Sequence, residues 1–300
     1  MKKKKKTQSR IERKHFYLFI LPWIIGFLAF VLIPMIMSLC MSFTKWDLLT
    51  EPTWVGFKNY IRAFTEDPLF YQSLKVTFVY SLFSVPLGLI ASLTVALLLN
   101  QITRSVKFFR TIYYLPVIVS GVAMMVLWAY IFNPQMGLLN QILKMFGING
   151  PGWIYDSKWA MPSLIIMSLW NIGGTVIIWL AGLSGVDEQL YESARLDGAS
   201  RWQQFINITL PTLSPTIFFN LVNGVIGALQ TFNQAYIMTD GGPKNSTLFF
   251  NFYLWKKAFK DFEMGYASAL AWVLFVIIMI LTLLVFKWSS MWVYYESEGE

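Results

Sequence analysis

Cysteine, histidine and charge are all scarce in this chain of 300 residues. A single cysteine, Cys40, excludes an internal disulfide framework and any cysteine-rich metal site. A single histidine, His15, excludes a His-Glu-x-x-His zinc site and leaves little for histidine-based catalysis. Charged residues make up 13% of the chain, against about 25% in soluble domains. Together with 56% hydrophobic residues, this composition excludes both a soluble globular protein and a disordered one.

Long uncharged stretches are what the sequence has instead. A helix needs about 20 mostly apolar residues to cross a bilayer, and six stretches without Asp, Glu, Lys or Arg are long enough. They place spanning helices near residues 17–41, 76–99, 111–132, 161–183, 212–237 and 265–286. The sequence therefore predicts an all-α integral membrane protein with six transmembrane helices.

Basic residues set the expected orientation of these helices. Lys2–Lys6, Arg10, Arg13 and Lys14 precede the first apolar stretch, and such clusters favour the cytoplasmic side. A cleaved signal peptide fits poorly, because the apolar stretch exceeds the about 7–15 residues of a signal sequence. Both termini are therefore expected to be cytoplasmic. The expected parts are a basic N-terminus (1–15), a first helix with an outer loop (16–75), a five-helix core (76–286) and a cytoplasmic tail (287–300).

The inner segment 187–211 is longer than a simple connection between helices. Glu188–Leu196 favours one short helix, Asp197-Gly198 favours a break, and Arg201–Ile208 favours a second short helix. From these residues alone, the segment is either an amphipathic helix pair resting on the membrane surface or a docking site for a partner.

The spacing within this segment resembles a known motif. Glu192-Ser193-Ala194, Gly198 and Ile208-x-Leu210-Pro211 resemble the EAA loop of binding-protein-dependent ABC importer permeases, with Ser193 where the family usually has alanine. Trp54–Tyr60 and Thr239–Thr247 resemble the carbohydrate-uptake class, in particular the maltose-type first permease subunit.

This resemblance implies the ABC importer type I permease fold, in a bacterial cytoplasmic membrane. It implies four kinds of partner: a second permease, two ATPase subunits, an extracytoplasmic solute-binding protein and a carbohydrate. It also implies that the EAA loop is a coupling helix that docks on the ATPase, with Glu192 paired to a basic residue and Gly198 allowing the turn. The expected coupling residues are Glu192, Ser193, Ala194, Leu196, Asp197, Gly198, Trp202 and Phe205, and Leu196, Trp202 and Phe205 are the expected apolar face.

No phosphate-binding G-x-x-x-x-G-K-[ST] motif occurs in the chain. ATP and Mg are therefore expected in the partner ATPases, and this chain is expected to bind no cofactor and no metal and to have no enzymatic site. Nucleic acid is not an expected partner, whereas membrane lipid is.

Uncharged polar residues in the spans point to a solute pathway. None of the expected spans contains a firm Asp, Glu, Lys or Arg, which favours a polar, uncharged solute over an ion-coupled carrier. The fifth and fourth spans each place polar and small residues on one helical face. These residues are Asn220, Asn223, Gly224, Gly227, Gln230, Thr231 and Gln234, and Ser168, Asn171 and Thr175. The alternative, equally weighted for the fifth-span stripe, is packing between helices. The repeat Ser84-Gly88-Ser92 favours such packing.

The sequence therefore predicts the permease subunit of an ATP-driven importer for a sugar or an oligosaccharide. Glycerol phosphate or an acidic oligosaccharide stays open as the substrate, because the partner permease could carry the matching charge. An ATP-independent carrier or channel is less favoured, since no inverted repeat is evident. A membrane enzyme is also less favoured, since no catalytic cluster is evident.

Overall fold

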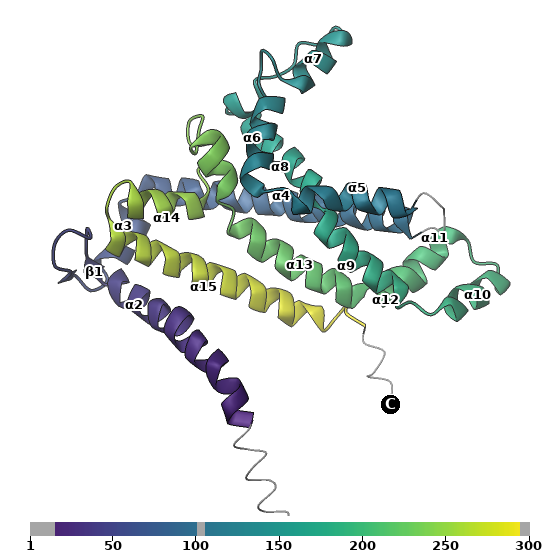
Figure 1. The fold of residues 1–300 in the computed structure, drawn as a ribbon, viewed down its shortest axis with the longest axis horizontal. Coiled ribbons are helices and arrows are strands. Elements are labelled where there is room, and N and C mark those ends of the chain that lie inside the picture. The colour runs from purple at the N-terminus through teal and green to yellow at the C-terminus, as the bar shows by residue number, and fades with distance from the viewer. Residues whose placement is uncertain (1–15, 101–105, 295–300) are drawn as a thin grey trace, which may run out of the picture. The chain divides into compact units, whose positions relative to one another are not determined.

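The computed structural model describes residues 16–100 and 106–294, and its regular structure is almost entirely helical (Figure 1). The basic N-terminal cluster and the end of the tail lie outside the described residues. The α-helices are α2 (Ile33–Ser42), α3 (Lys58–Thr65), α4 (Pro68–Leu99), α5 (Val106–Ile118), α6 (Gly121–Ile131), α7 (Leu138–Met145), α8 (Ala160–Ser168), α9 (Gly173–Ser184), α10 (Glu188–Leu196), α11 (Arg201–Gln204), α12 (Leu210–Thr212), α13 (Ser214–Leu229), α14 (Phe250–Phe259) and α15 (Met264–Ser289). The strands β1 (Thr44–Lys45) and β2 (Thr53–Trp54) pair antiparallel.

Three unbroken helices in the described part are long and apolar enough to cross a membrane. They are Phe16–Ser42, Pro68–Leu99 and Met264–Ser289, and they correspond to the expected spans 17–41, 76–99 and 265–286. Three further candidates are helix pairs that meet at a bend, so this part holds up to six spans if each pair is one span. The pairs are Thr111–Ile118 with Gly121–Ile131 (106°), Ala160–Asn171 with Gly173–Ser184 (48°) and Arg201–Thr212 with Ser214–Leu229 (65°).

The expected spans 111–132, 161–183 and 212–237 are thus wrong as continuous helices. Ser120 adopts φ −52° and ψ 129°, which interrupts the helical hydrogen bonding between α5 and α6. A 3₁₀ turn ends the helix before Ile172, and the chain bends there into α9. The helix expected to reach residue 237 ends at Leu229, because Gln230 (φ −95°, ψ 12°) leaves the α-helical conformation.

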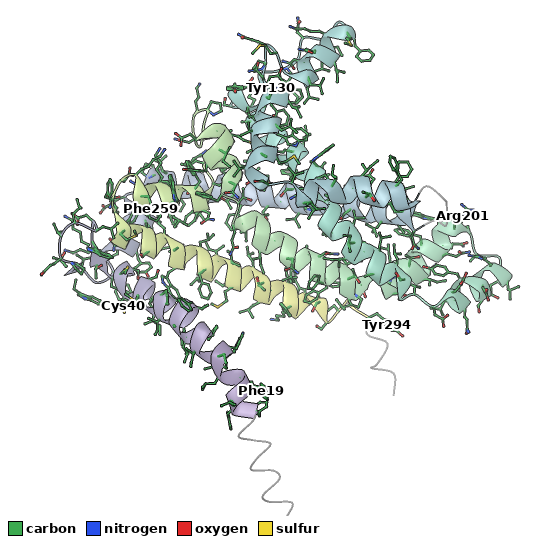
Figure 2. The ribbon with its side chains drawn as sticks, in the orientation of Figure 1. Phe19, Cys40, Tyr130, Arg201, Phe259 and Tyr294 are labelled. Carbon is green, nitrogen blue, oxygen red and sulfur yellow. The ribbon has the colours of Figure 1, made fainter. Side chains whose placement is uncertain are left out.

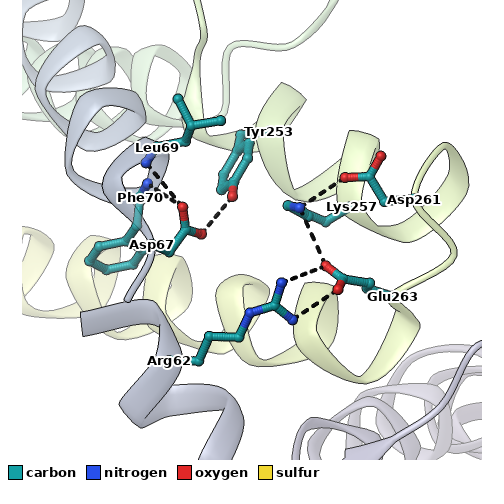
Figure 3. Close-up of polar contacts among 8 residues, drawn as sticks. All are labelled: Arg62, Asp67, Leu69, Phe70, Tyr253, Lys257, Asp261 and Glu263. Carbon is teal, nitrogen blue, oxygen red and sulfur yellow. Dashed lines mark hydrogen bonds and ion pairs between the residues drawn. The ribbon is translucent and has the colours of Figure 1, made fainter. Parts of the chain in front are cut away.

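The chain forms two compact units, and the first comprises Met1–Glu66 with Leu254–Val273. In this unit the helix Phe16–Ser42 projects apolar side chains outward along its length, among them Phe19 with 80% of its surface exposed (Figure 2). Arg62 forms a two-point ion pair with Glu263 at 2.9 and 3.1 Å (Figure 3). Lys257 lies 2.9 Å from the carboxylate of Asp261 and 3.3 Å from that of Glu263.

The second unit comprises Asp67–Tyr253 with Leu274–Glu300, and α4 is its central helix. α4 contacts both α9 and α13 (Figure 1). The second unit has an apolar cluster of buried side chains from α4, from α9 and from Leu213, the residue just before α13. The cluster is Ala96, Leu99, Val176, Trp179, Leu183 and Leu213.

The start of α4 is fixed by a capping aspartate. The carboxylate of Asp67 accepts hydrogen bonds from the backbone N–H groups of Leu69 (3.0 Å) and Phe70 (3.3 Å). The hydroxyl of Tyr253 donates to the same carboxylate at 2.5 Å (Figure 3). Because an aspartate in this position satisfies backbone donors that the helix leaves unpaired, α4 begins at Pro68 rather than near residue 76.

Candidate functional site

A cavity of about 570 Å³ lies within the second unit, between α4, α9 and α13. Nine of the ten side chains expected along a pathway line it: Ser168, Asn171, Thr175, Asn220, Asn223, Gly224, Gly227, Thr231 and Gln234. The other lining residues are Tyr80, Ser84, Val85, Gly88, Leu89, Ile172, Ile178, Phe219 and Ala228. Among these described residues, none carries an acidic or basic side chain. The cavity is therefore polar without being charged.

Small residues let the three helices that enclose the cavity approach one another closely. A Cβ atom on Gly224 of α13 would lie 3.2 Å from Cγ1 of Val85 on α4. A Cβ atom on Gly182 of α9 would lie 2.7 Å from Oγ1 of Thr216 on α13. A larger residue at either position would push the helices apart, so both glycines allow the close approach of α13 to its neighbours, and Gly224 does so beside the cavity.

Asn220 is the most informative residue of the lining. Its side chain is 5% exposed, and its amide nitrogen Nδ2 has no hydrogen-bond partner among the described residues. A buried donor without a partner costs about 1–3 kcal/mol. Asn220 lines the cavity, but neighbouring atoms cover Nδ2 itself, so an oxygen atom of a solute would satisfy this donor once the side chain turns toward the cavity. The neighbouring Asn223 differs, because its Nδ2 already donates to the carbonyl oxygen of Phe219 at 2.8 Å.

Gln230 is the expected pathway residue that does not line the cavity. The face on which the sequence placed it assumes a helix that continues past Leu229, and the helix ends there. The side chain of Gln230 is exposed, and its backbone carbonyl oxygen accepts a hydrogen bond of 3.0 Å from Nδ2 of Asn251. Thr231 reaches the cavity from the short irregular segment that follows the helix, and Gln234 reaches it from the helical turn that precedes the π-helix Ala235–Thr239.

Several lining residues were not among the expected pathway residues, and Tyr80, Ser84, Gly88 and Phe219 are four of them. Ser84 and Gly88 belong to the repeat Ser84-Gly88-Ser92, whose spacing favoured a seam for helix packing. Ser84 and Gly88 line the cavity, and Ser92 packs between helices. Ser92 is fully buried and accepts a hydrogen bond from Trp179. The spacing of four residues identifies the face of α4 that points to the other helices. It does not show which residues on that face line the cavity and which are buried in helix packing.

One wall of the cavity rests on the segment that follows the Thr239–Thr247 motif. The ring of Tyr80 meets the ring of Phe249 edge-to-face at 5.1 Å. Phe249 and Phe250 are fully buried, and the N–H of Phe250 donates to Oγ1 of Thr77 on α4 at 2.8 Å. The motif itself is closed by a hydrogen bond of 2.7 Å between Thr247 and Thr239. The motif is thus linked by packing to α4 and to the cavity.

The segment 187–211 forms the two expected short helices, and α10 has the expected bounds Glu188–Leu196. The expected break is confirmed at Gly198. Its φ is +78°, a backbone conformation that residues other than glycine rarely adopt. The second helix starts at Arg201, where Ser200 and Gln203 form a reciprocal capping box. It continues through a π-helical turn, Phe205–Thr209, into α12.

The two short helices present an exposed surface at one end of the second unit (Figure 1). Leu196 is 90% exposed and Trp202 is 67% exposed, and the rings of Trp202 and Phe205 lie 5.6 Å apart. Glu192, Ser193 and Asp197 are exposed as well, whereas Ala194 is half-buried. A hydrogen bond of 2.8 Å between the hydroxyls of Tyr191 and Thr209 ties α10 to the second helix. The two short helices are therefore held together, and they expose the large apolar side chains of Leu196 and Trp202.

Residues 84–294 match the family described as "Binding-protein-dependent transport system inner membrane component". The chain belongs to this family. The family resemblance expected from the EAA-like loop is thereby confirmed, and the loop lies within the matched residues. The chain is accordingly an inner membrane component.

Relatives of known sequence and structure agree with the family match. The "Probable ABC transporter permease protein YesP" of Bacillus subtilis (strain 168) is 46% identical over 301 residues, which cover 99% of this chain and 97% of that protein. The "Lactose transport system permease protein LacF" of Rhizobium radiobacter is 33% identical and covers 93% of this chain and 97% of that protein.

A solved structure confirms the expected ABC importer permease fold. It is a chain of a bacterial alginate ABC transporter in complex with an alginate pentasaccharide-bound periplasmic protein. The TM-score is 0.80 at 26% sequence identity, and the likeness covers 92% of this chain and 94% of that chain.

Proposed function

We propose that this chain is the permease subunit of an ATP-driven importer that takes up a sugar or an oligosaccharide delivered by an extracytoplasmic solute-binding protein. The observation that carries the proposal is the uncharged polar cavity, with the buried donor of Asn220 on its wall. Sugar hydroxyls donate and accept hydrogen bonds, so hydroxyl and amide side chains suit them. The names of the relatives, which refer to lactose and to alginate, support a carbohydrate.

Glycerol phosphate or an acidic oligosaccharide is the second candidate for the substrate. The alginate transporter favours it, because that structure is in complex with a periplasmic protein bound to an alginate pentasaccharide. In this chain the cavity lining offers no cation among the described residues, so a matching charge would come from the partner permease.

The paired short helices support a coupling role. In the proposed complex Glu192 pairs with a basic residue of a separate ATPase, and Gly198 provides the turn between the helices. Leu196, Trp202 and Phe205 form the apolar docking face, while Ser193, Ala194 and Asp197 complete the surface. ATP and Mg are held by the ATPases, and this chain contributes motion rather than chemistry.

The bent helix pairs support a topology of six spans, each pair crossing the membrane once. In this topology both termini are cytoplasmic, and so are the N-terminus 1–15, the coupling loop 187–211 and the tail 287–300. The first helix and outer loop occupy 16–75, and the five-helix core occupies 76–286. The complete importer contains a second permease, two ATPases and the solute-binding protein, and it resides in a bacterial cytoplasmic membrane.

The test is sugar-stimulated ATP hydrolysis by the importer purified from its host membranes with its partner subunits. Proteoliposomes containing the solute-binding protein would be screened with neutral and acidic oligosaccharides. The variant Asn220→Ala removes the unpartnered donor, and Asn223→Ala is the matched control, because that amide already bonds to Phe219.

We expect a neutral saccharide to stimulate hydrolysis, and we expect Asn220→Ala to weaken that stimulation several times more than Asn223→Ala does. Stimulation by uronate-containing sugars alone would favour the second candidate. A chain that purifies without ATPase subunits and still conducts solute would contradict the importer and support an ATP-independent carrier or channel.

A further inference from the structure

The two short helices of the segment 187–211 meet at a turn whose hydrogen bonds lie close to Gly198. The N–H of Ala199 donates to the carbonyl oxygen of Ala194 at 2.8 Å, and Nε2 of Gln204 donates to the carbonyl oxygen of Ala199 at 2.9 Å. Both bonds act at the turn, and the backbone of a glycine is freer than that of other residues. A helix held only there would pivot about Gly198, so the far end of α10 needs a support of its own.

A hydrogen bond between the hydroxyls of Tyr191 and Thr209 supplies that support. The two oxygen atoms lie 2.8 Å apart, and Thr209 is 5% exposed. Tyr191 is half-buried and lies about two helical turns before Gly198. The hydroxyl of Thr209 also lies 3.5 Å from the carbonyl oxygen of Gln204, to which it can donate while it accepts from Tyr191. Among the described residues of α10 and of the second short helix, this is the one hydrogen bond that joins the two helices, and no ion pair joins them.

Thr209 connects this bond to the joint before α13. It is the last residue of the π-helical turn Phe205–Thr209, and π turns within helices occur frequently at functional sites. Its carbonyl oxygen accepts a hydrogen bond of 2.9 Å from the N–H of Leu213, the buried residue at the 65° bend into α13. Hydrogen bonds therefore lead from α10 through Thr209 to the start of the helix that carries Asn220.

Tyr191 supports the exposed surface of the segment from behind. Its neighbour Glu192 is exposed, and so are Leu196 and Trp202. The hydroxyl of Tyr191 is bonded to the buried Thr209 instead. A change confined to that hydroxyl therefore leaves the side chains of the proposed docking face in place.

We propose that Tyr191 is a positioning residue for coupling, whose bond to Thr209 makes α10 and the second short helix move as one body. Movement of α10 on the ATPase then reaches Leu213 and α13. Without the bond, α10 stays docked but pivots at Gly198, and the movement is not passed on. This inference rests on the proposed coupling of the segment 187–211 to an ATPase, and it separates the transmission of movement from the binding of the ATPase.

The first test removes the hydroxyl and keeps the ring, in the variant Tyr191→Phe. The complete importer is purified with its partner subunits and placed in proteoliposomes with the solute-binding protein. The measurements are the ATPase retained per permease, the thermal unfolding midpoint, the stimulation of ATP hydrolysis by sugar and the sugar transported per ATP. We expect the first two to stay near those of the unmodified importer and the last two to fall severalfold. Tyr155→Phe, which changes a tyrosine that is 57% exposed, is the matched control and should change none of them.

The second test changes the partner hydroxyl. Thr209→Val keeps the shape of the side chain but has no hydroxyl, whereas Thr209→Ser keeps the hydroxyl. We expect the valine variant to lose stimulation severalfold and the serine variant to retain most of it. Tyr191→Phe with Thr209→Val should lose little more than either single variant, because both remove the same bond. The control is Thr212→Val, since that hydroxyl donates to the carbonyl oxygen of Ile208 in its own helix.

Three results would overturn the inference. Full stimulation in Tyr191→Phe would show that movement reaches α13 without the bond. Equal loss in Thr209→Ser and Thr209→Val would show that the hydroxyl is not what matters. Loss of the ATPase together with the stimulation in Tyr191→Phe would show that Tyr191 serves docking rather than transmission. An unmodified importer that retains no ATPase would instead contradict the proposed function, and the inference would fall with it.

Discussion

The indole nitrogen of Trp179 on α9 donates a hydrogen bond of 2.9 Å to the hydroxyl of Ser92 on α4. Trp179 is 1% exposed and Ser92 is fully buried. The bond joins two helices that enclose the cavity, and Trp179 also belongs to an apolar cluster of the second unit, so the bond helps to hold α9 against α4.

Ser92→Ala is expected to destabilise the second unit by about 1–2 kcal/mol, because the buried indole N–H loses its acceptor. The measurement is the thermal unfolding midpoint of the purified importer. The control is Ser184→Ala, since that hydroxyl is exposed and bonds only within its own helix. The double variant Ser92→Ala with Trp179→Phe should cost less than the sum of the single variants. Strict additivity would show that the bond contributes nothing.

Gly198→Ala is expected to weaken ATPase coupling without a steric clash. A Cβ atom there would meet nothing within 4 Å, but the backbone has a φ of +78°. Holding another residue in that conformation costs about 1–2 kcal/mol, which favours a rearranged turn. Gly185→Ala, at a φ of −86°, is the control. The measurement is the ATPase retained per permease on gentle purification, and equal retention by both variants would contradict the prediction.

Glu192→Lys is expected to reduce ATPase retention by reversing the charge offered to the partner. Glu192 is exposed, and no ion pair within the described ranges uses it, so the fold should tolerate the change. Glu188→Lys, one turn earlier on α10 and also exposed, is the matched control. An unfolding midpoint that falls together with retention would point to misfolding instead.

Glu263→Gln is expected to destabilise the first unit by about 1 kcal/mol, because the carboxylate meets Arg62 at two points and Lys257 at a third. Asp261→Asn should cost less, since within the described part of this cluster Asp261 forms an ion pair with Lys257 alone. Limited proteolysis of the segment around residue 50 is a local measurement of this unit. Equal sensitivity of the two variants would refute the ranking.

The same cluster gives the first unit a dependence on pH. Burial lowers the pKa of Lys257, but the hydrogen bond to Asp261 and the charges of Glu263 and Asp261 outweigh it, so the pKa is raised from its ordinary value of 10.5. A raised pKa contributes stability that is present below 10.5 and is lost as the pH rises through the folded-state value. Lys257→Met should remove that loss above pH 10.5, as measured by proteolysis at stepped pH.

Gln230→Ala is expected to leave sugar-stimulated hydrolysis unchanged, because its side chain lies outside the cavity. Gln234→Ala should weaken the stimulation, because Gln234 lines it. A continuous helix through residue 237 would place both side chains on the pathway, so comparing the two variants tests that expectation against the observed end of α13 at Leu229. Equal loss of stimulation in both variants would show that Gln230 contributes to the pathway as much as Gln234 does.

The sequence predicted the helices well and their interruptions poorly. α10 has the expected bounds because a capping Asp187 and the glycine at 198 mark both ends. The bend at Ile172 precedes Gly173-Gly174, and the bend at Leu213 precedes Pro215 in the first turn of α13. Pro86 lies inside the unbroken helix α4, so such residues alone do not specify where a span bends. The end of α13 at Leu229 explains why Gln230, alone among the expected pathway residues, does not line the cavity.

Leu213 occupies the 65° bend between the helix Arg201–Thr212 and the cavity wall α13. It is 1% exposed and belongs to the apolar cluster with Trp179, so the joint is anchored in that cluster. In the proposed importer, a movement of the helix Arg201–Thr212 that begins at Trp202 would therefore pass through Leu213 into α13, the helix that carries Asn220.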